Sequence, residues 1–210
     1  MRLRRLYLLM VACFLFLGGI QAQDFPKVVF PGDYPDPSIL RDGKDYYMTH
    51  SPFYYAPGFL IWHSTDLMHW EPVCRALPEY EGSAMAPDLL KYQGRYYLYY
   101  PTSTGENYVI YADDIRGPWS KPVKLEVTGI DPGHVIGEDG KRYLFTNNGW
   151  ITPLSEDGLK VIGQSRKVYD GWKYPANWVT EGKNMYLESP KLIRKDGYYY
   201  MISAEGGTAG

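Results

Sequence analysis

The sequence predicts an all-β fold built from repeated four-stranded units, and three observations support this prediction. Tyrosine supplies 21 of the 210 residues, and aromatic residues favour strands. The chain also contains 22 glycines and 16 prolines, which favour turns. Four segments of similar sequence recur about 50 residues apart, and no amphipathic helical pattern longer than two turns lies between them.

Each of the four similar segments predicts a β-hairpin. Each contains a proline, an apolar pair or near-pair, a polar turn that ends in glycine, and a strand rich in aromatic residues. The glycine of each turn provides the backbone freedom that a tight turn requires. The segments are DPSILRDGKDYYM (36–48), APDLLKYQGRYYLYY (86–100), DPGHVIGEDGKRYLF (131–145) and SPKLIRKDGYYYMIS (189–203).

A second repeated piece follows the first two hairpins. Residues 60–73 and 109–123 share a strand, a turn that starts with aspartate, a tryptophan and a Pro-Val pair. About four short strands per period are typical of a β-propeller blade, although a β-sandwich with similar hairpins is the alternative. The fourth unit stops half a blade after it begins, so we expect about three and a half blades of a longer propeller, or a ring that a partner completes.

The first 22 residues have the pattern of a signal peptide. Three arginines precede an apolar run at 6–17, and Ala22 is a small residue at a cleavage point. The alternatives are a retained anchor, for which the run is short, and a lipid-modified Cys13. We therefore expect export to the periplasm or outside the cell, no stable membrane insertion after cleavage, and a mature propeller chain over residues 23–210.

Composition and motifs exclude several classes of function. A net charge of −2 provides no basic surface for nucleic acid. The four histidines have no zinc-ligand spacing, and no EF-hand loop is present, so no metal site is predicted. The Gly-x-Ser-x-Gly elbow and the phosphate-binding Gly-x-x-x-x-Gly-Lys loop are both absent from the sequence.

Acidic residues occur at one position of the repeat. When the segments are aligned on their prolines, Asp36 and Asp131 coincide, and Glu188 lies one residue earlier in the fourth unit. In a propeller these positions begin the innermost strands, so the three acids would converge at one end of the channel. The alternative is that Asp-Pro only begins a turn.

Converging carboxylates have the chemistry that cleavage of a glycosidic bond needs. One carboxyl group, kept protonated, donates to the leaving oxygen, and an ionised one activates water or attacks the anomeric carbon. A third acid can orient the proton donor and raise its pKa by like-charge repulsion.

Three segments that contain these acids resemble the signature motifs of glycoside hydrolase family 43. They are YPDPS (34–38), GIDP (129–132) and ESPKL (188–192), and the resemblance extends from about residue 25 to residue 210. The family consists of five-bladed propellers that hydrolyse xylosyl and arabinofuranosyl linkages of plant cell-wall polysaccharides with inversion. The resemblance implies that Asp36 is the general base, Asp131 the pKa modulator and Glu188 the general acid. It implies no cofactor.

The resemblance also suggests residues that bind the sugar. Phe53 and Trp150 follow inner hairpins, where an aromatic ring can stack on a sugar, although core packing is the alternative for each. Met85 stands where many family members carry an aromatic residue. Glu205 follows the fourth inner hairpin and either meets substrate hydroxyls or is a loop carboxylate.

Two questions about function stay open at the level of sequence. A non-catalytic carbohydrate-binding propeller is the alternative to a hydrolase, and the set of three acids favours the hydrolase. A related family that cleaves fructosides fits the ESPK segment less well. The segment at 58–64 and the AEGGT run favour a β-xylosidase over an arabinofuranosidase or an endo-arabinanase.

Overall fold

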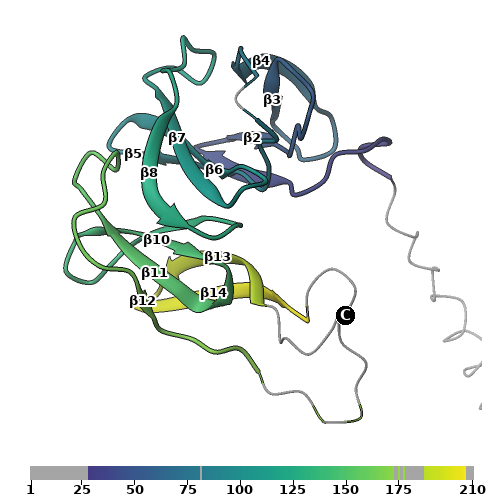
Figure 1. Ribbon diagram of the computed structural model, residues 1–210. Coiled ribbons are helices and arrows are strands. Elements are labelled where there is room, and N and C mark those ends of the chain that lie inside the picture. The colour runs from purple at the N-terminus through teal and green to yellow at the C-terminus, as the bar shows by residue number, and fades with distance from the viewer. Residues whose placement is uncertain (1–27, 81, 173–174, 176, 178–186, 207–210) are drawn as a thin grey trace, which may run out of the picture. The chain divides into compact units, whose positions relative to one another are not determined.

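The computed structural model describes residues 28–80, 82–172, 175, 177 and 187–206 (Figure 1). Residues 33–210 form one compact unit, distinct from residues 1–32. The described residues form β-strands and one 3-10 turn, and none of them belongs to a helix that could span a membrane. The all-β prediction is therefore confirmed. The predicted signal peptide lies outside the described residues.

The strands form three four-stranded antiparallel sheets and one two-stranded sheet, which we call blades 1 to 4 in chain order (Figure 1). Blade 1 consists of β1 (Ser38–Asp42), β2 (Asp45–Thr49), β3 (Gly58–Ser64) and β4 (Glu71–Leu77). Blade 2 consists of β5 (Asp88–Tyr92), β6 (Arg95–Pro101), β7 (Glu106–Ala112) and β8 (Val123–Thr128). Blade 3 consists of β9 (Gly133–Ile136), β10 (Arg142–Thr146), the turn η2 (Asn147–Gly149), β11 (Trp150–Leu154) and β12 (Arg166–Lys167). Blade 4 consists of β13 (Leu187–Lys195) and β14 (Tyr198–Glu205), which confirms the prediction of three and a half blades.

The predicted hairpin turns are present in all four blades. In blade 1, Asp42 pairs with Asp45 across the turn, and Gly43 between them has a φ of +65°. Glycine adopts this left-handed conformation without the steric cost that a Cβ imposes. Gly94, Gly140 and Gly197 also have positive φ angles. Each blade therefore begins with an inner strand that runs from the repeat proline to a glycine turn.

The apolar core lies between adjacent blades. Along β6, Tyr96, Leu98 and Tyr100 pack in a cluster shared with blade 1. Tyr97 and Tyr99 pack in a second cluster, which is shared with blade 3. This alternation follows from the two-residue period of side chains along a strand. A third cluster joins blade 3 to blade 4, so each blade is held by its neighbours.

A buried cation lies between blades 2 and 3. Arg142 is 1% exposed, and no carboxylate among the described residues pairs with it. Its Nε donates to Nε2 of His134 at 3.0 Å, and an Nη donates to the hydroxyl of Tyr99 at 3.0 Å. Its Cζ lies 4.6 Å and 4.2 Å from the ring centroids of Tyr92 and Tyr97. Cation–π contacts with two tyrosine rings and a hydrogen bond to a neutral imidazole therefore stabilise the guanidinium group in place of an ion pair.

Blades 3 and 4 approach each other closely at their inner strands. Gly133 begins β9, and a Cβ at this position would overlap the carbonyl oxygen of Pro190 in β13. Glycine is therefore needed for the close approach of the two backbones. This approach brings the start of β13 next to the residues that precede β9.

One face of blade 4 is packed against blade 3, and the other face is exposed. Tyr199 and Met201 of β14 pack against the core of blade 3. Tyr200 and Ile202, which alternate with them, are exposed, and Ile202 is 66% exposed. An exposed apolar strip is typical of a surface that packs against another element.

Candidate active site

The backbone has the same unusual conformation at four equivalent positions of the repeat. Asp36, Ala86, Asp131 and Ser189 have φ angles of 53°, 42°, 57° and 50°, and each precedes a proline. A positive φ is strained for a residue with a Cβ, at about 1–3 kcal/mol. The fold therefore imposes this geometry, and the alignment of the repeats on their prolines describes the structure correctly.

These four residues line one cavity. Its volume is about 150 Å³, and Pro37, Pro87 and Lys191 complete its lining. Blades 1, 2, 3 and 4 each contribute one of the four repeat positions. The structure thus brings Asp36 and Asp131 together, although 95 positions separate them in the sequence.

Asp36 is exposed at this cavity and is held by a buried serine. The hydroxyl of Ser51 donates a hydrogen bond to Oδ2 of Asp36. The same hydroxyl oxygen accepts a hydrogen bond from the amide of Ala86 in blade 2, at 2.6 Å. Oδ1 of Asp36 has no hydrogen-bond partner among the described residues. One oxygen of the carboxylate is therefore engaged, and the other is available to a substrate or to water.

The carboxylate of Asp131 is held by a backbone amide and not, like that of Asp36, by a side-chain hydroxyl. Its Oδ2 accepts a hydrogen bond from the backbone amide of Ser189 at 3.0 Å. Burial raises the pKa of the Asp131 carboxyl group, and the nearby charge of Asp36 adds to this increase. The Ser189 amide and the Lys191 ammonium group oppose it. Asp131 is therefore an acid whose ionisation is resisted by its surroundings, as is typical of functional carboxyl groups.

Glu188 lies at the start of β13, directly before Ser189. It pairs with Ala204 of β14, and the register shifts between Glu188 and Lys191, which marks a bulge. Bulges change the direction of a side chain at the end of a strand. The side chain of Glu188 is half-buried and does not line the cavity of Asp36 and Asp131. Its neighbour Ser189 does line that cavity, and the Ser189 amide binds Asp131.

Lys191 connects three blades next to the acids. Its Nζ donates to Oδ1 of Asp88 at 2.9 Å and to the carbonyl oxygens of Pro132 and Pro87, at 2.7 Å and 3.3 Å. The other oxygen of Asp88 accepts the amide of His134 at 2.8 Å. The ammonium group of blade 4 is therefore anchored to blades 2 and 3, which fixes the start of β13.

Phe53 and Met85 do not line the cavity of Asp36 and Asp131. Phe53 is half-buried, has a φ of +47°, and its amide donates to the carbonyl oxygen of Ala84 at 2.9 Å. Met85 is half-buried and directly precedes Ala86. Both residues belong to the loops that border the strand starts.

Trp150 lies at a separate cavity. It is 42% exposed and borders a space of about 350 Å³ between the end of β8 and the start of β11. The lining consists of uncharged groups: Thr128, Gly129, Thr146, Asn147, Asn148, Thr152 and Ser165. An exposed aromatic ring among hydroxyl and amide groups has the chemistry of a sugar-binding surface.

Both oxygens of Glu205 are engaged within the protein. Oε1 accepts a hydrogen bond from the hydroxyl of Tyr169 at 2.8 Å, and Oε2 accepts one from the backbone amide of Trp172 at 2.6 Å. The side chain thus attaches the end of β14 to the segment that follows β12. These bonds favour the interpretation of Glu205 as a loop carboxylate.

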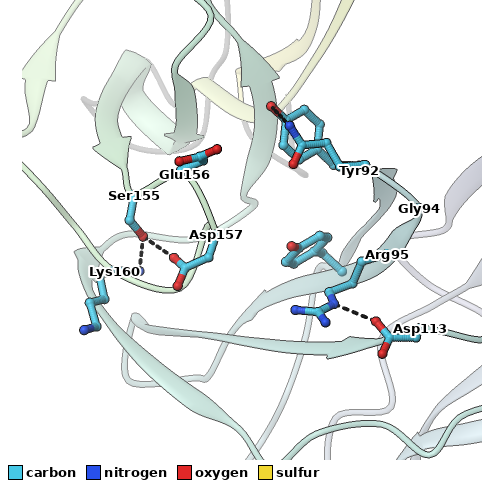
Figure 2. A pocket seen from close by; sticks show the side chains of 10 residues that line it. Tyr92, Gly94, Arg95, Asp113, Ser155, Glu156, Asp157 and Lys160 are labelled. Carbon is cyan, nitrogen blue, oxygen red and sulfur yellow. Dashed lines mark hydrogen bonds and ion pairs between the residues drawn. The ribbon is translucent and has the colours of Figure 1, made fainter.

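A larger cavity, of about 680 Å³, lies at the opposite end of β5 from the acids. Figure 2 shows Arg95 paired with Asp113 at 2.7 Å, and the carboxylate of Asp157 bound to the hydroxyl of Ser155. Asp157 also accepts the amide of Leu159, so it serves the turn of its own loop. Its three acidic residues, Asp113, Glu156 and Asp157, lie at the other end of the strands from the repeat prolines, and its size alone does not make it the functional site.

The described residues contain no group of three or more side chains that could hold a metal ion. Two residues that matter for the geometry, Ser51 and Lys191, were not predicted from the sequence. The signal that could have found them is their register: Lys191 follows the repeat proline, and Ser51 follows the end of the first inner hairpin.

Comparison with known proteins identifies relatives over most of this chain. A xylosidase/arabinosidase of Butyrivibrio fibrisolvens is 34% identical over 86% of this chain and 38% of its own length. A non-reducing end alpha-L-arabinofuranosidase of Bacteroides ovatus is 30% identical over 97% of this chain and 40% of its own length.

The crystal structure of the GH43 protein BlXynB from Bacillus licheniformis superposes with a TM-score of 0.73 at 34% identity, over 87% of this chain and 38% of that one. The chain thus spans well under half the length of these relatives. Residues 25–210 match the family model described as glycosyl hydrolases family 43. The chain belongs to glycosyl hydrolases family 43.

Proposed function

We propose that the protein is an inverting glycoside hydrolase that removes xylosyl or arabinofuranosyl groups from plant cell-wall polysaccharides and oligosaccharides. The observation that carries this proposal is the convergence of Asp36 and Asp131 on one cavity, with Glu188 beside the residue whose amide binds Asp131. The names of the relatives, which are xylosidases and arabinofuranosidases, support the choice of sugar.

In the proposed reaction, Asp36 acts as the general base and Glu188 as the general acid. Asp36 takes a proton from a water molecule, and the water oxygen forms a bond to the anomeric carbon. The bond from that carbon to the leaving oxygen breaks, and Glu188 gives its proton to this oxygen. Only protons are exchanged with the protein, so this chemistry requires no cofactor.

The exposure of Asp36 supports its role as the base. Its free Oδ1 is accessible, and its Oδ2 is fixed by Ser51, so the group is both oriented and open to water. Inversion requires room for that water. We therefore expect the carboxyl groups of Asp36 and Glu188 to lie about 6.5–9.5 Å apart in the enzyme–substrate complex, and a separation near 5 Å would contradict inversion.

Asp131 has the proposed role of orienting β13 and modulating the pKa of the general acid, Glu188. Its carboxylate holds the amide of Ser189, the residue next to Glu188. A negative charge at this point also disfavours ionisation of a nearby carboxyl group, which keeps a proton donor protonated.

We further propose that the rim loops hold the sugar. Trp150, with its exposed ring among uncharged polar groups, is the best supported of the proposed binding residues. Phe53 and Met85 border the strand starts and would form the wall nearest the acids. Glu205 would act indirectly, through the segment it holds.

Export remains part of the proposal. The arginines and the apolar run within residues 1–22 favour translocation, and a polymeric plant substrate lies outside the cell. Accumulation of the protein in the periplasm or medium, with an N-terminus near residue 23, would support this.

The test is release of the chromophore from an aryl β-xyloside and an aryl α-arabinofuranoside by the full-length gene product. A matched Glu188→Gln protein serves as the control, because the amide keeps the shape of the side chain but cannot donate the proton. We expect turnover by the wild type and its collapse in the variant. Two inactive proteins that both bind xylan or arabinan would instead identify a non-catalytic binding propeller.

A further inference from the structure

The hydroxyl of Ser51 lies between blades 1 and 2 and forms a hydrogen bond to each of them. Ser51 is 4% exposed, and its amide donates to the carbonyl oxygen of Pro35 at 2.9 Å. Its Oγ accepts the amide of Ala86, so the hydroxyl proton points away from that amide and toward Asp36. The direction of the hydrogen bond to the carboxylate is thus determined by a backbone group of the next blade.

Comparison with blade 3 shows what this serine changes. Asp131 is equivalent to Asp36, and Ser189 is equivalent to Ala86. Between blades 3 and 4 the carboxylate binds the amide of the next blade directly. Between blades 1 and 2 the same two positions are joined through the inserted hydroxyl of Ser51.

The residue of blade 3 that corresponds to Ser51 is Asn147. Its amide donates to the carbonyl oxygen of Ile130 at 2.9 Å, as the Ser51 amide does to Pro35. The side chain of Asn147, however, accepts the amide of Ile130 at 3.1 Å instead of contacting Asp131. Of these two equivalent residues, only Ser51 therefore contacts the carboxylate of its own blade.

We propose that Ser51 is the positioning residue of the general base: its hydroxyl holds Oδ2 of Asp36 so that Oδ1 faces the attacking water. This inference rests on the proposed function. The hydroxyl spares Asp36 from a direct bond to the backbone amide, which is the bond that Asp131 makes. Two carboxylates at equivalent positions thereby acquire different tasks, one open to water and one bound to β13.

The test compares Ser51→Ala with Ser38→Ala in the full-length protein. Ser38 is a matched control, because it is 6% exposed and its hydroxyl also accepts an amide of blade 2, that of Leu89, at 2.9 Å. Its hydroxyl does not contact Asp36. Both variants lose one buried hydrogen bond between the same blades, and Ser51→Ala also loses the bond to Asp36. Thermal melting of Ser38→Ala therefore measures the cost of the bond between the blades alone.

We expect Ser51→Ala to lower kcat for the aryl glycoside by about ten- to a hundredfold, because a displaced catalytic group loses most of its efficiency. KM should stay within about twofold, since the substrate contacts are unchanged. Ser38→Ala should keep the kcat of the wild type. Ser51→Thr, which retains the hydroxyl, should recover most of the lost kcat.

A double variant shows whether Ser51 acts through Asp36. In an Asp36→Asn protein, adding Ser51→Ala should leave the residual rate unchanged, because the group that Ser51 positions is already gone. A further loss equal to that in the wild type would overturn the inference.

The outcomes separate this inference from the proposed function. If the wild type is active, Asp36→Asn loses most of this activity and Ser51→Ala keeps the kcat of Ser38→Ala, the inference fails while the hydrolase stands. If the wild type hydrolyses neither glycoside, the proposed function fails and the role of Ser51 falls with it.

Discussion

Acidification should destabilise the protein through His134. The imidazole accepts a hydrogen bond from Arg142 of β10, stacks at 5.8 Å on the ring of Tyr99 of β6, and lies 6.3 Å from the ring of Tyr92 of β5. The carboxylate of Asp88, which accepts its backbone amide, is the nearby negative charge. Protonation of Nε2 would remove the acceptor of Arg142 and place two cations in contact.

The size of the effect follows from the pKa of His134. Burial, with the charge of Arg142, lowers it from 6.5 to about 4, against a smaller opposing effect of Asp88. The folded state therefore binds the proton more weakly than the unfolded state does. The stability from this group is fully present above pH 6.5 and is lost as the pH falls toward 4. At about 1.4 kcal/mol per pKa unit, the loss is about 2 kcal/mol at pH 5 and about 3 kcal/mol at pH 4.

The assay is urea unfolding, followed by tryptophan fluorescence, at several pH values between about 7.5 and 4.5. The comparison is with His134→Gln, whose amide oxygen can accept the hydrogen bond of Arg142 but does not titrate. The wild-type free energy of unfolding, relative to that of the variant, should fall by about 2–3 kcal/mol across this range. His69→Gln is the control, since the side chain of His69 is 88% exposed.

Parallel pH curves for the wild type and His134→Gln would refute the reasoning. A second measurement covers the case in which the glutamine variant does not fold. Proton NMR of the His134 ring in the wild type should show a titration midpoint near 4. A midpoint near 6.5 would show that the ring is not held neutral by Arg142.

Three further predictions follow from the packing around the acids. Gly133→Ala should lower the free energy of unfolding by about 3 kcal/mol, because the new Cβ collides with the blade 4 backbone. Gly43→Ala, whose Cβ meets no atom within 4 Å, should cost only about 1–2 kcal/mol for its positive φ, and equal losses in thermal melts would contradict this. Asp131→Asn should be more stable than the wild type at neutral pH, since burial raises the pKa of Asp131 and its ionisation opposes folding. The gain in stability should vanish below about pH 4, and a pH-independent difference in urea titrations would argue against this prediction. Lys191→Met should cost about 2 kcal/mol by leaving Asp88 without its cation, and an unchanged urea midpoint would show that the ion pair contributes nothing.

The sequence predicts the parts of the fold that depend on local chemistry. The glycine turns and the tyrosine-rich strands are local patterns, and their recurrence indicates the blade. The buried Arg142 could not be predicted in this way. It follows a lysine after a turn, where a basic residue is ordinarily solvated, and it is buried only because Tyr92 and Tyr97 of another blade enclose it.

The same limit applies to the candidate site. Alignment on the repeat proline was enough to bring Asp36 and Asp131 to one cavity, because both occupy the same backbone position. Glu188 departs from that position, and the bulge in β13 that accommodates it leaves no local pattern in the sequence. Ser51 was missed because its partners are Asp36 and Ala86, and only the contact of two blades joins them.

At the four equivalent positions of the repeat, the fold determines the backbone conformation and the side chain determines the chemistry. The backbone conformation is the same whether the residue is aspartate, alanine or serine, so the geometry comes from the blade and the reactivity from the side chain. Ala86 illustrates the consequence. A carboxylate at this position would be the third acid on a cavity of about 150 Å³, and its charge would raise the pKa of Asp131 further. Alanine instead contributes only its amide, which orients Ser51, so the residue without a functional side chain helps to hold the proposed base.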